Sequence, residues 1–109
     1  MKAKIYIAGK ISGEKMHKAS MKFGKAKKQL EALGYEAIHP LDVIDDFHCR
    51  WEEGAKKCKA ALKACDAVYF LPDYTQEAAT QYELYFAREH NINVYTELNQ
   101  IPNLNNTSC

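Results

Sequence analysis

One carboxylate interrupts what is otherwise a small, apolar stripe on a helix. Ala79, Glu83 and Ala87 are spaced four residues apart and so lie one above another on a helix. Tyr82 and Phe86 lie beside them. A charge on the face that packs against the core costs free energy unless a partner or a ligand uses it. Such a carboxylate can be a nucleophile on a sugar anomeric carbon, a general base, or an acceptor for ribose hydroxyls. The alternative is an ordinary ion pair with a lysine or arginine.

Two further residues fit the same chemistry. Tyr6, on a short β-rich run, can hold the Glu83 carboxylate in position with its hydroxyl. Glu77, six residues before Glu83, can act as the general acid that protonates a leaving base. Each has a structural alternative. Tyr6 can be a core tyrosine with a satisfied hydroxyl, and Glu77 can be a surface residue that complements the helix dipole.

Two loops are candidates for the walls of a ligand site. The first is the glycine-bracketed loop 9–13, because glycines let the backbone approach an anion or a sugar. It matches neither a dinucleotide fingerprint nor a P-loop, and a plain tight turn is the alternative. The second is the turn 72–77. Its Tyr74, together with Trp51 and Ile11, can stack on or enclose a purine or pyrimidine. The candidate substrate-binding residues are Gly9, Lys10, Ile11, Trp51, Asp73 and Tyr74. Trp51 can instead be a core anchor.

The rest of the sequence alternates strand and helix patterns, which predicts an α/β fold. We expect strands at 4–8, 35–38, 66–71 and 92–95, and helices at 17–33, 52–64 and 75–91. Gly34 fits the left-handed position that ends the first helix, Thr75 fits an N-cap, and Asn91 ends the third helix. Right-handed crossovers predict a parallel sheet of about four strands in the order 2-1-3-4, with helices on both faces.

This strand order predicts where a ligand would bind. Ligands of such folds bind outside the carboxyl ends of the strands, at the point where the strand order reverses. Here that point lies between the first and third strands, where loop 9–13 meets turn 72–77. Glu83, about two turns into the third helix, can point back into the same crevice.

Composition narrows the range of partners. The chain has 109 residues, with 47% hydrophobic residues, 27% charged residues and a net charge of +1. These values predict one globular domain over residues 1–97, followed by a polar tail over 98–109 that is flexible or loosely docked. The low net charge and the lack of a long apolar segment argue against a nucleic-acid polymer or a membrane as partner. The lysine clusters are explained by solvated helix faces.

No metal or cofactor is expected. The four cysteines, Cys49, Cys58, Cys65 and Cys109, have no paired short spacing of the kind that binds zinc. We expect reduced thiols in a cytoplasmic protein, with the three internal ones filling the core. A group of acidic residues and histidines is better explained by helix capping and loop solvation than by a metal site. Its members are His39, Asp42, Asp45, Asp46 and His48.

Four segments together carry a family resemblance. They are KIYIAGKISG at 4–13, GYEAIHP at 34–40, CDAVYFLP at 65–72 and ELYFA at 83–87. With these segments in this order over about residues 4–95, the chain resembles the nucleoside 2-deoxyribosyltransferase-like superfamily, in particular its small branch of unknown function. The resemblance implies a three-layer, flavodoxin-like or Rossmann-like fold in a homo-oligomer, a dimer or larger. Characterised relatives cleave the N-glycosidic bond of deoxynucleosides or their monophosphates without a cofactor.

The resemblance also implies roles by position. Glu83 falls where the relatives have a nucleophilic glutamate, Tyr6 where they have a tyrosine near it, and Gly9 in their substrate loop. Glu77 falls where transferases have an aspartate and phosphate-binding members have a serine. Two departures stand out. Cys58 replaces the relatives' catalytic aspartate, and the sequence EAAT at 77–80 replaces the small branch's serine-x-glycine-alanine pattern. A negative charge at Glu77 favours a free nucleoside over a nucleotide.

Two functions therefore remain open at this point. The first is an enzyme that cleaves or transfers the N-glycosidic bond of a small-molecule nucleoside or nucleotide through Glu83. The second is a noncatalytic domain that binds a nucleoside, a nucleotide or a protein partner. The second is motivated by Cys58 and by the altered sequence at 77–80.

Overall fold

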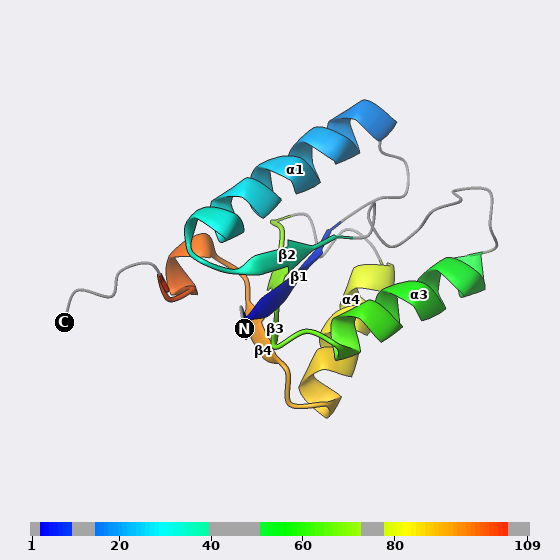
Figure 1. The fold of residues 1–109 in the computed structure, drawn as a ribbon. Coiled ribbons are helices and arrows are strands. Elements are labelled where there is room, and N and C mark those ends of the chain that lie inside the picture. The colour runs from blue at the N-terminus through cyan, green and yellow to red at the C-terminus, as the bar shows by residue number, and fades with distance from the viewer. Residues whose placement is uncertain (1–2, 10–14, 40–50, 73–77, 105–109) are drawn as a thin grey trace.

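The sheet has four parallel strands in the order β2-β1-β3-β4, as the sequence predicted. A computed structural model of the chain describes residues 3–9, 15–39, 51–72 and 78–104 (Figure 1). The strands are β1 (Lys4–Ala8), β2 (Glu36–Ile38), β3 (Ala67–Phe70) and β4 (Asn93–Tyr95). All four fall within the predicted segments, and the predicted α/β class is confirmed.

The register places Tyr6 of β1 between two neighbouring strands. Tyr6 lies opposite Ile38 of β2 and Val68 of β3. Val68 in turn lies opposite Val94 of β4. Tyr6 is two residues from the end of β1, about 7 Å below the carboxyl edge of the sheet at the usual rise per residue.

Helices cover both faces of the sheet. α1 (Met16–Ala32) lies on one face, and α3 (Trp51–Lys63) and α4 (Ala78–Glu89) lie on the other (Figure 1). The predicted three layers are therefore present. α1 and α3 begin and end within one residue of the predicted bounds, whereas the predicted cap Thr75 lies outside the described residues.

Two helices end in the same way with different residues. Gly34 has φ 98° and Asn91 has φ 57°, so both occupy the left-handed region. After α1, the Tyr35 N–H donates to the Leu30 carbonyl at 3.1 Å, and after α4 the Ile92 N–H donates to the Ala87 carbonyl at 2.9 Å. These six-to-one bonds satisfy carbonyls that the helices leave without partners. Glycine and asparagine suit this position because both tolerate positive φ.

The α1 face of the sheet has an apolar core. Phe23, Ala26 and Leu30 recur at helical spacing on α1 and are buried against the sheet. Ile5 and Ile7 point to this face from β1, on either side of Tyr6, because side chains alternate along a strand. This packing fixes α1 on the sheet.

The α3/α4 face buries a second core. Cys58 and Leu62 of α3 and Ala87 of α4 pack against it. Tyr6 and Val68 supply the sheet side of this cluster. The expectation that the internal cysteines fill the core is confirmed for Cys58 and Cys65, which are buried, whereas Cys49 lies outside the described residues.

The segment 98–104, the first part of the expected polar tail, packs on the α1 face. After the short helix η2 (Leu98–Gln100), Ile101 is buried in the α1-face core. The Leu104 N–H donates to the Leu33 carbonyl at 2.8 Å, and the Tyr35 hydroxyl donates to the Pro102 carbonyl at 2.8 Å. Figure 1 shows this segment beside the C-terminal end of α1. The overall polar composition of this segment gives no indication of packing, and its one buried hydrophobic residue is Ile101.

Candidate functional site

Tyr6 is fully buried in the middle of the sheet. Its side chain is 0% exposed and belongs to the α3/α4-face core. Its hydroxyl is also buried and has no hydrogen-bond partner among the described residues. The Glu83 carboxyl and the Cys58 thiol are the groups that influence this hydroxyl electrostatically. A buried hydroxyl without a hydrogen bond is unusual in a folded protein.

Glu83 reaches this point from α4. Its residue is only partly buried, while its Oε2 atom is inaccessible to solvent. Ala87, one turn further along, is 0% exposed, so Glu83 lies on the inward face of the helix. The structure thus brings Tyr6 and Glu83 together, from elements that are far apart in the sequence.

Cys58 completes the cluster from α3. It is 7% exposed and carries a thiol rather than a disulfide. Its inward spacing with Leu62 was the signal that it lies on the sheet side of α3. We call Tyr6, Cys58 and Glu83 the Tyr-Cys-Glu cluster.

The cluster holds the Tyr6 hydroxyl in its neutral form. Burial is the largest cause that raises the pKa of Tyr6 well above its ordinary value, followed by the charge of Glu83 and then by Cys58. Tyr6 therefore keeps its proton throughout the neutral range. It is suited to donate a hydrogen bond to the carboxylate, and it is unsuited to act as a base.

Gly9 follows β1 at the edge of this site. A Cβ placed on Gly9 would lie 2.8 Å from Cδ1 and 3.3 Å from Cβ of Leu71. The Leu71 N–H also donates to the Ala8 carbonyl at 2.8 Å. The absence of a side chain at Gly9 thus lets the ends of β1 and β3 approach each other. This close packing supplies a structural reason for Gly9, besides the predicted contact with a ligand.

Most of the other predicted site residues lie outside the described residues. They are Lys10, Ile11, Asp73, Tyr74 and Glu77. Trp51 opens α3, and its side chain is likewise outside the described part. Tyr6, Glu83 and Gly9 are therefore the parts of the predicted site that the structure places, and Cys58 is an addition to them.

An aromatic contact borders the cluster on the solvent side. The Lys59 Nζ lies 4.9 Å from the centre of the Tyr82 ring and 5.9 Å from that of Phe86. It also donates a long hydrogen bond of 3.5 Å to the Tyr82 hydroxyl. Tyr82 is 54% exposed, so it lies at the rim of the α3–α4 contact, not on the inward stripe.

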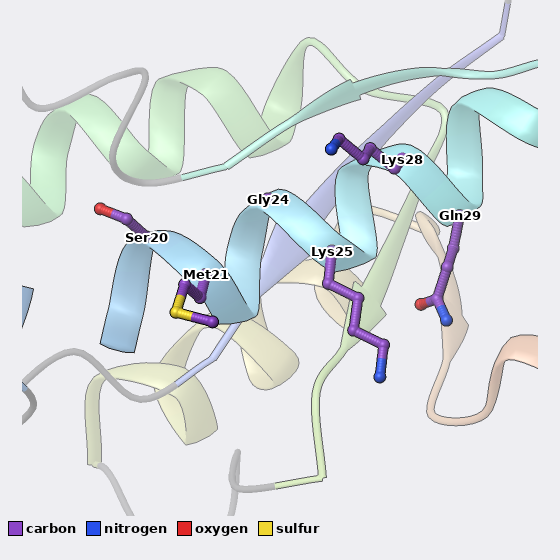
Figure 2. A pocket seen from close by; sticks show the side chains of 6 residues that line it. All are labelled: Ser20, Met21, Gly24, Lys25, Lys28 and Gln29. Carbon is purple, nitrogen blue, oxygen red and sulfur yellow. The ribbon is translucent and has the colours of Figure 1, made fainter. Parts of the chain in front are cut away.

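A hollow on α1 lies apart from this site. It has a volume of about 500 Å³, and Figure 2 labels the residues that line it. They are Ser20, Met21, Gly24, Lys25, Lys28 and Gln29. All lie on α1, across the sheet from the Tyr-Cys-Glu cluster, and Met21 is 72% exposed. No residue of the cluster lines this hollow.

Metal ligation and membrane insertion can be assessed for the described residues. Among them, no three histidine, cysteine, aspartate or glutamate side chains are grouped so that they could hold a metal ion. His39 is buried with its ring 5.6 Å from that of Phe23, whereas the acidic residues and His48 considered with it lie outside these ranges. None of the helices in the described segments has the length and apolar character needed to cross a bilayer.

The fold and the comparisons define the class and then the family. A parallel sheet in the order 2-1-3-4 between helical layers is an α/β fold of the Rossmann-like or flavodoxin-like type. The family model described as "Domain of unknown function (DUF4406)" matches residues 3–96, and the chain belongs to this family. A search of curated proteins gave no match. The expected membership of a family of unknown function is therefore confirmed, whereas a relationship to nucleoside 2-deoxyribosyltransferases stays a prediction.

Proposed function

We propose that this protein cleaves or transfers the N-glycosidic bond of a nucleoside or deoxynucleoside, with Glu83 as the nucleophile and no cofactor. The observation that carries the proposal is the placement of a glutamate and a neutral tyrosine against each other within an otherwise apolar layer. A carboxylate kept on an inward helix face costs free energy, and catalysis at an anomeric carbon is one use that offsets this cost.

The reaction would run in two balanced steps. A Glu83 oxygen attacks the anomeric carbon and forms a glycosyl ester while the bond to the base nitrogen breaks. Glu77 protonates the departing base. Water or a second base then attacks the same carbon, gives its proton to the Glu77 carboxylate and releases Glu83, which gives hydrolysis or transfer. Tyr6 holds the carboxylate by a hydrogen bond, since its raised pKa keeps its proton in place.

The direct test is a base-release assay with the purified protein. We expect free base from at least one of a panel of deoxynucleosides and ribonucleosides, separated by chromatography. Glu83→Gln should abolish release, and Glu89→Gln is the matched control because Glu89 is an exposed acid on the same helix. Absence of turnover across the panel, or equal turnover in Glu83→Gln, would contradict the proposal.

A second candidate is a noncatalytic domain that binds a nucleoside, a nucleotide or a protein partner. The burial of Glu83 Oε2 favours this candidate, because a nucleophile needs an accessible oxygen. It predicts that a nucleoside raises the melting temperature without releasing base. If no nucleoside or nucleotide changes the melting temperature, the ligand-binding version fails and the protein-partner version remains.

The proposed assembly is a homo-oligomer, a dimer or larger, by similarity to the superfamily. Sedimentation equilibrium measures this directly. A monomer at all accessible concentrations would contradict the assembly and leave the proposed chemistry unaffected.

A further inference from the structure

The hollow on α1 contains a glycine that packing inside the chain does not require. Gly24 lies in the middle of α1 and lines the hollow. A Cβ placed on Gly24 would meet nothing within 4 Å beyond the helix's own backbone and the adjoining residues. Alanine would therefore fit at this position and would favour the helix more than glycine does. The contacts of the described residues thus give no reason for a glycine here.

An exposed methionine borders the space that Gly24 leaves. Met21 lines the same hollow and is 72% exposed. One exposed apolar side chain is common on protein surfaces and needs no explanation by itself. Methionine, however, is flexible and polarizable, and it recurs on surfaces that bind other proteins. Beside the space at Gly24, it gives α1 a place where an apolar side chain of another molecule can pack.

The charges around the hollow are positive. α1 contains five lysines and one acidic residue, Glu31. Lys25 and Lys28 line the hollow and are exposed, and Figure 2 shows them extending in different directions from the helix. Lys22 and Lys28 lie three residues before and after Lys25, so like charges are neighbours on this surface. Solvation explains lysines on a helix, but it does not explain their grouping around an apolar notch.

This combination restricts what can cover the hollow. A second copy placed face to face would bring two groups of lysines together, and their repulsion opposes that contact. Nucleic acid would match the charge, but α1 has no arginine, tyrosine or tryptophan to contact bases, and its Phe23 is buried. A lipid surface would require several exposed apolar residues, whereas Met21 is the only large one among the described side chains of α1.

We propose that the hollow on α1 binds an acidic segment of a partner protein, with an apolar side chain of that segment against Met21 and its carboxylates at Lys25 and Lys28. Ser20 and Gln29, the first and last lining residues along α1, supply hydrogen-bonding groups for the same segment. The hollow lies across the sheet from the Tyr-Cys-Glu cluster. The proposed binding therefore does not depend on the proposed chemistry.

Selection from a random library of short peptides displayed on phage tests which chemistry the hollow takes. The full chain is the bait, and the double variant Lys25→Gln, Lys28→Gln removes peptides that bind elsewhere. We expect the enriched peptides to carry a net negative charge and one large apolar residue. A selection that enriches no peptides, or peptides without negative charge, overturns the proposal.

Two double variants of equal charge then locate the binding surface. Lys25→Gln with Lys28→Gln should weaken binding of a labelled, enriched peptide about 3- to 10-fold, as expected for two exposed ion pairs. Lys56→Gln with Lys57→Gln removes the same charge from exposed positions on α3 and should leave the affinity unchanged. Fluorescence anisotropy measures both affinities. Equal weakening by the two double variants would mean that net charge alone attracts the peptide, and it overturns the site.

Gly24→Ala should change stability and binding in opposite directions. The melting temperature should rise slightly, because alanine favours the helix and its Cβ has open space. The affinity for the peptide should fall, because the new methyl group occupies part of the hollow. Unchanged affinity overturns the placement of the apolar side chain. A lower melting temperature would show that Gly24 serves the fold, and it likewise overturns the proposal.

The two other occupants are tested with the same protein. A DNA oligonucleotide, single-stranded or duplex, that binds through Lys25 and Lys28 more tightly than the peptide would make the hollow a nucleic-acid site. A dimer in sedimentation equilibrium that dissociates in Met21→Ala would assign the hollow to a second copy. Either result overturns the proposal. Base release should be the same in all these variants, so failure of the proposed function leaves the binding tests unaffected.

Discussion

The two faces of the sheet place their buried tyrosine hydroxyls in different surroundings. On the α1 face, the Tyr35 hydroxyl donates to the Pro102 carbonyl at 2.8 Å. On the α3/α4 face, the Tyr6 hydroxyl is influenced by Glu83 and Cys58 but has no hydrogen-bond partner among the described residues. The Tyr35 arrangement is the usual one in a stable protein, because a buried hydroxyl that forms a hydrogen bond costs little folding free energy.

The missing hydrogen bond of Tyr6 is the reason to look for function on the α3/α4 face. Poorly satisfied buried polar groups cost about 1–3 kcal/mol each, so a sequence selected for stability alone would replace them with apolar residues. Local departures from good packing are expected where function requires them. The α1 face should therefore govern stability, and the α3/α4 face should govern activity.

Glu83→Gln should have the largest effect and acts only on the α3/α4 face. Loss of a nucleophile should lower kcat/KM for base release at least about 10³-fold. The free energy of unfolding should not fall, because a buried charge is replaced by a neutral side chain of the same shape. Urea denaturation alongside the assay measures both. A large loss of stability would mean that the carboxylate is structural and would remove the contrast between the faces.

Leu30→Ala is the corresponding change on the α1 face. Leu30 is 0% exposed in the α1-face core, so its truncation should lower the free energy of unfolding by about 3 kcal/mol. Base release per folded molecule should stay at the wild-type value. If activity falls in proportion to the stability change under conditions where the protein is folded, the faces are coupled and the division proposed here is wrong.

Gly9→Ala tests the close packing of β1 against β3 at the edge of the sheet, where the α1 face and the α3/α4 face meet. The new Cβ would lie 2.8 Å from Leu71 Cδ1, so the leucine must shift. We expect a loss of about 1–2 kcal/mol in the free energy of unfolding. In a Leu71→Ala background, the same substitution should cost much less, and a double-mutant cycle measures this coupling. Additive effects would show that Gly9 is needed for a reason other than this contact.

The sheet and its helices were predictable from the sequence because their signals are local. Alternating strand and helix patterns gave the strand order, and Gly34 marked the end of α1. The approach of Tyr6 to Glu83 also followed, because the strand order places β1 next to β3 and α4 follows β3. These inferences need periodicity and chain connectivity only.

The contact between Cys58 and Tyr6 was not predictable in the same way. Periodicity indicates that Cys58 faces the sheet, but the strand that it meets depends on how far α3 slides along the sheet. That position is set by side-chain packing across the layers and not by any local pattern. The packing of Ile101 was missed because one apolar residue in a polar stretch has no period to detect.

A matched pair of tyrosine substitutions tests the comparison itself. Tyr6→Phe should lower base release about 10-fold without lowering the free energy of unfolding, because it removes a buried hydroxyl that has no hydrogen-bond partner. Tyr35→Phe should do the reverse, with a loss of about 1 kcal/mol and unchanged activity, because it removes the bond to Pro102. Chemical denaturation and the base-release assay give both numbers. Equal effects of the two substitutions would abolish the distinction between the faces.

The smallest expected effect is a loss of stability at alkaline pH. Burial raises the pKa of the Cys65 thiol from 9.0 to about 11. Between these values the unfolded chain loses the thiol proton while the folded protein keeps it, so the folded state is destabilised as pH rises from 9 to 11. Below pH 9 this group has no effect. Cys65→Ala should make the decline in melting temperature shallower over that interval, and an unchanged decline would place its origin in the tyrosines.

The segment 98–104 has a consequence for how the domain is delimited. The family model ends at residue 96, yet the chain beyond it supplies Ile101 to the core and the acceptor for Tyr35. A fragment trimmed at the family boundary would keep every strand and helix of the sheet layers. It would also uncover an apolar corner beside the C-terminal end of α1, where proteases or other copies of the chain could attach. The unit of sequence similarity in this chain is therefore shorter than the unit that folds.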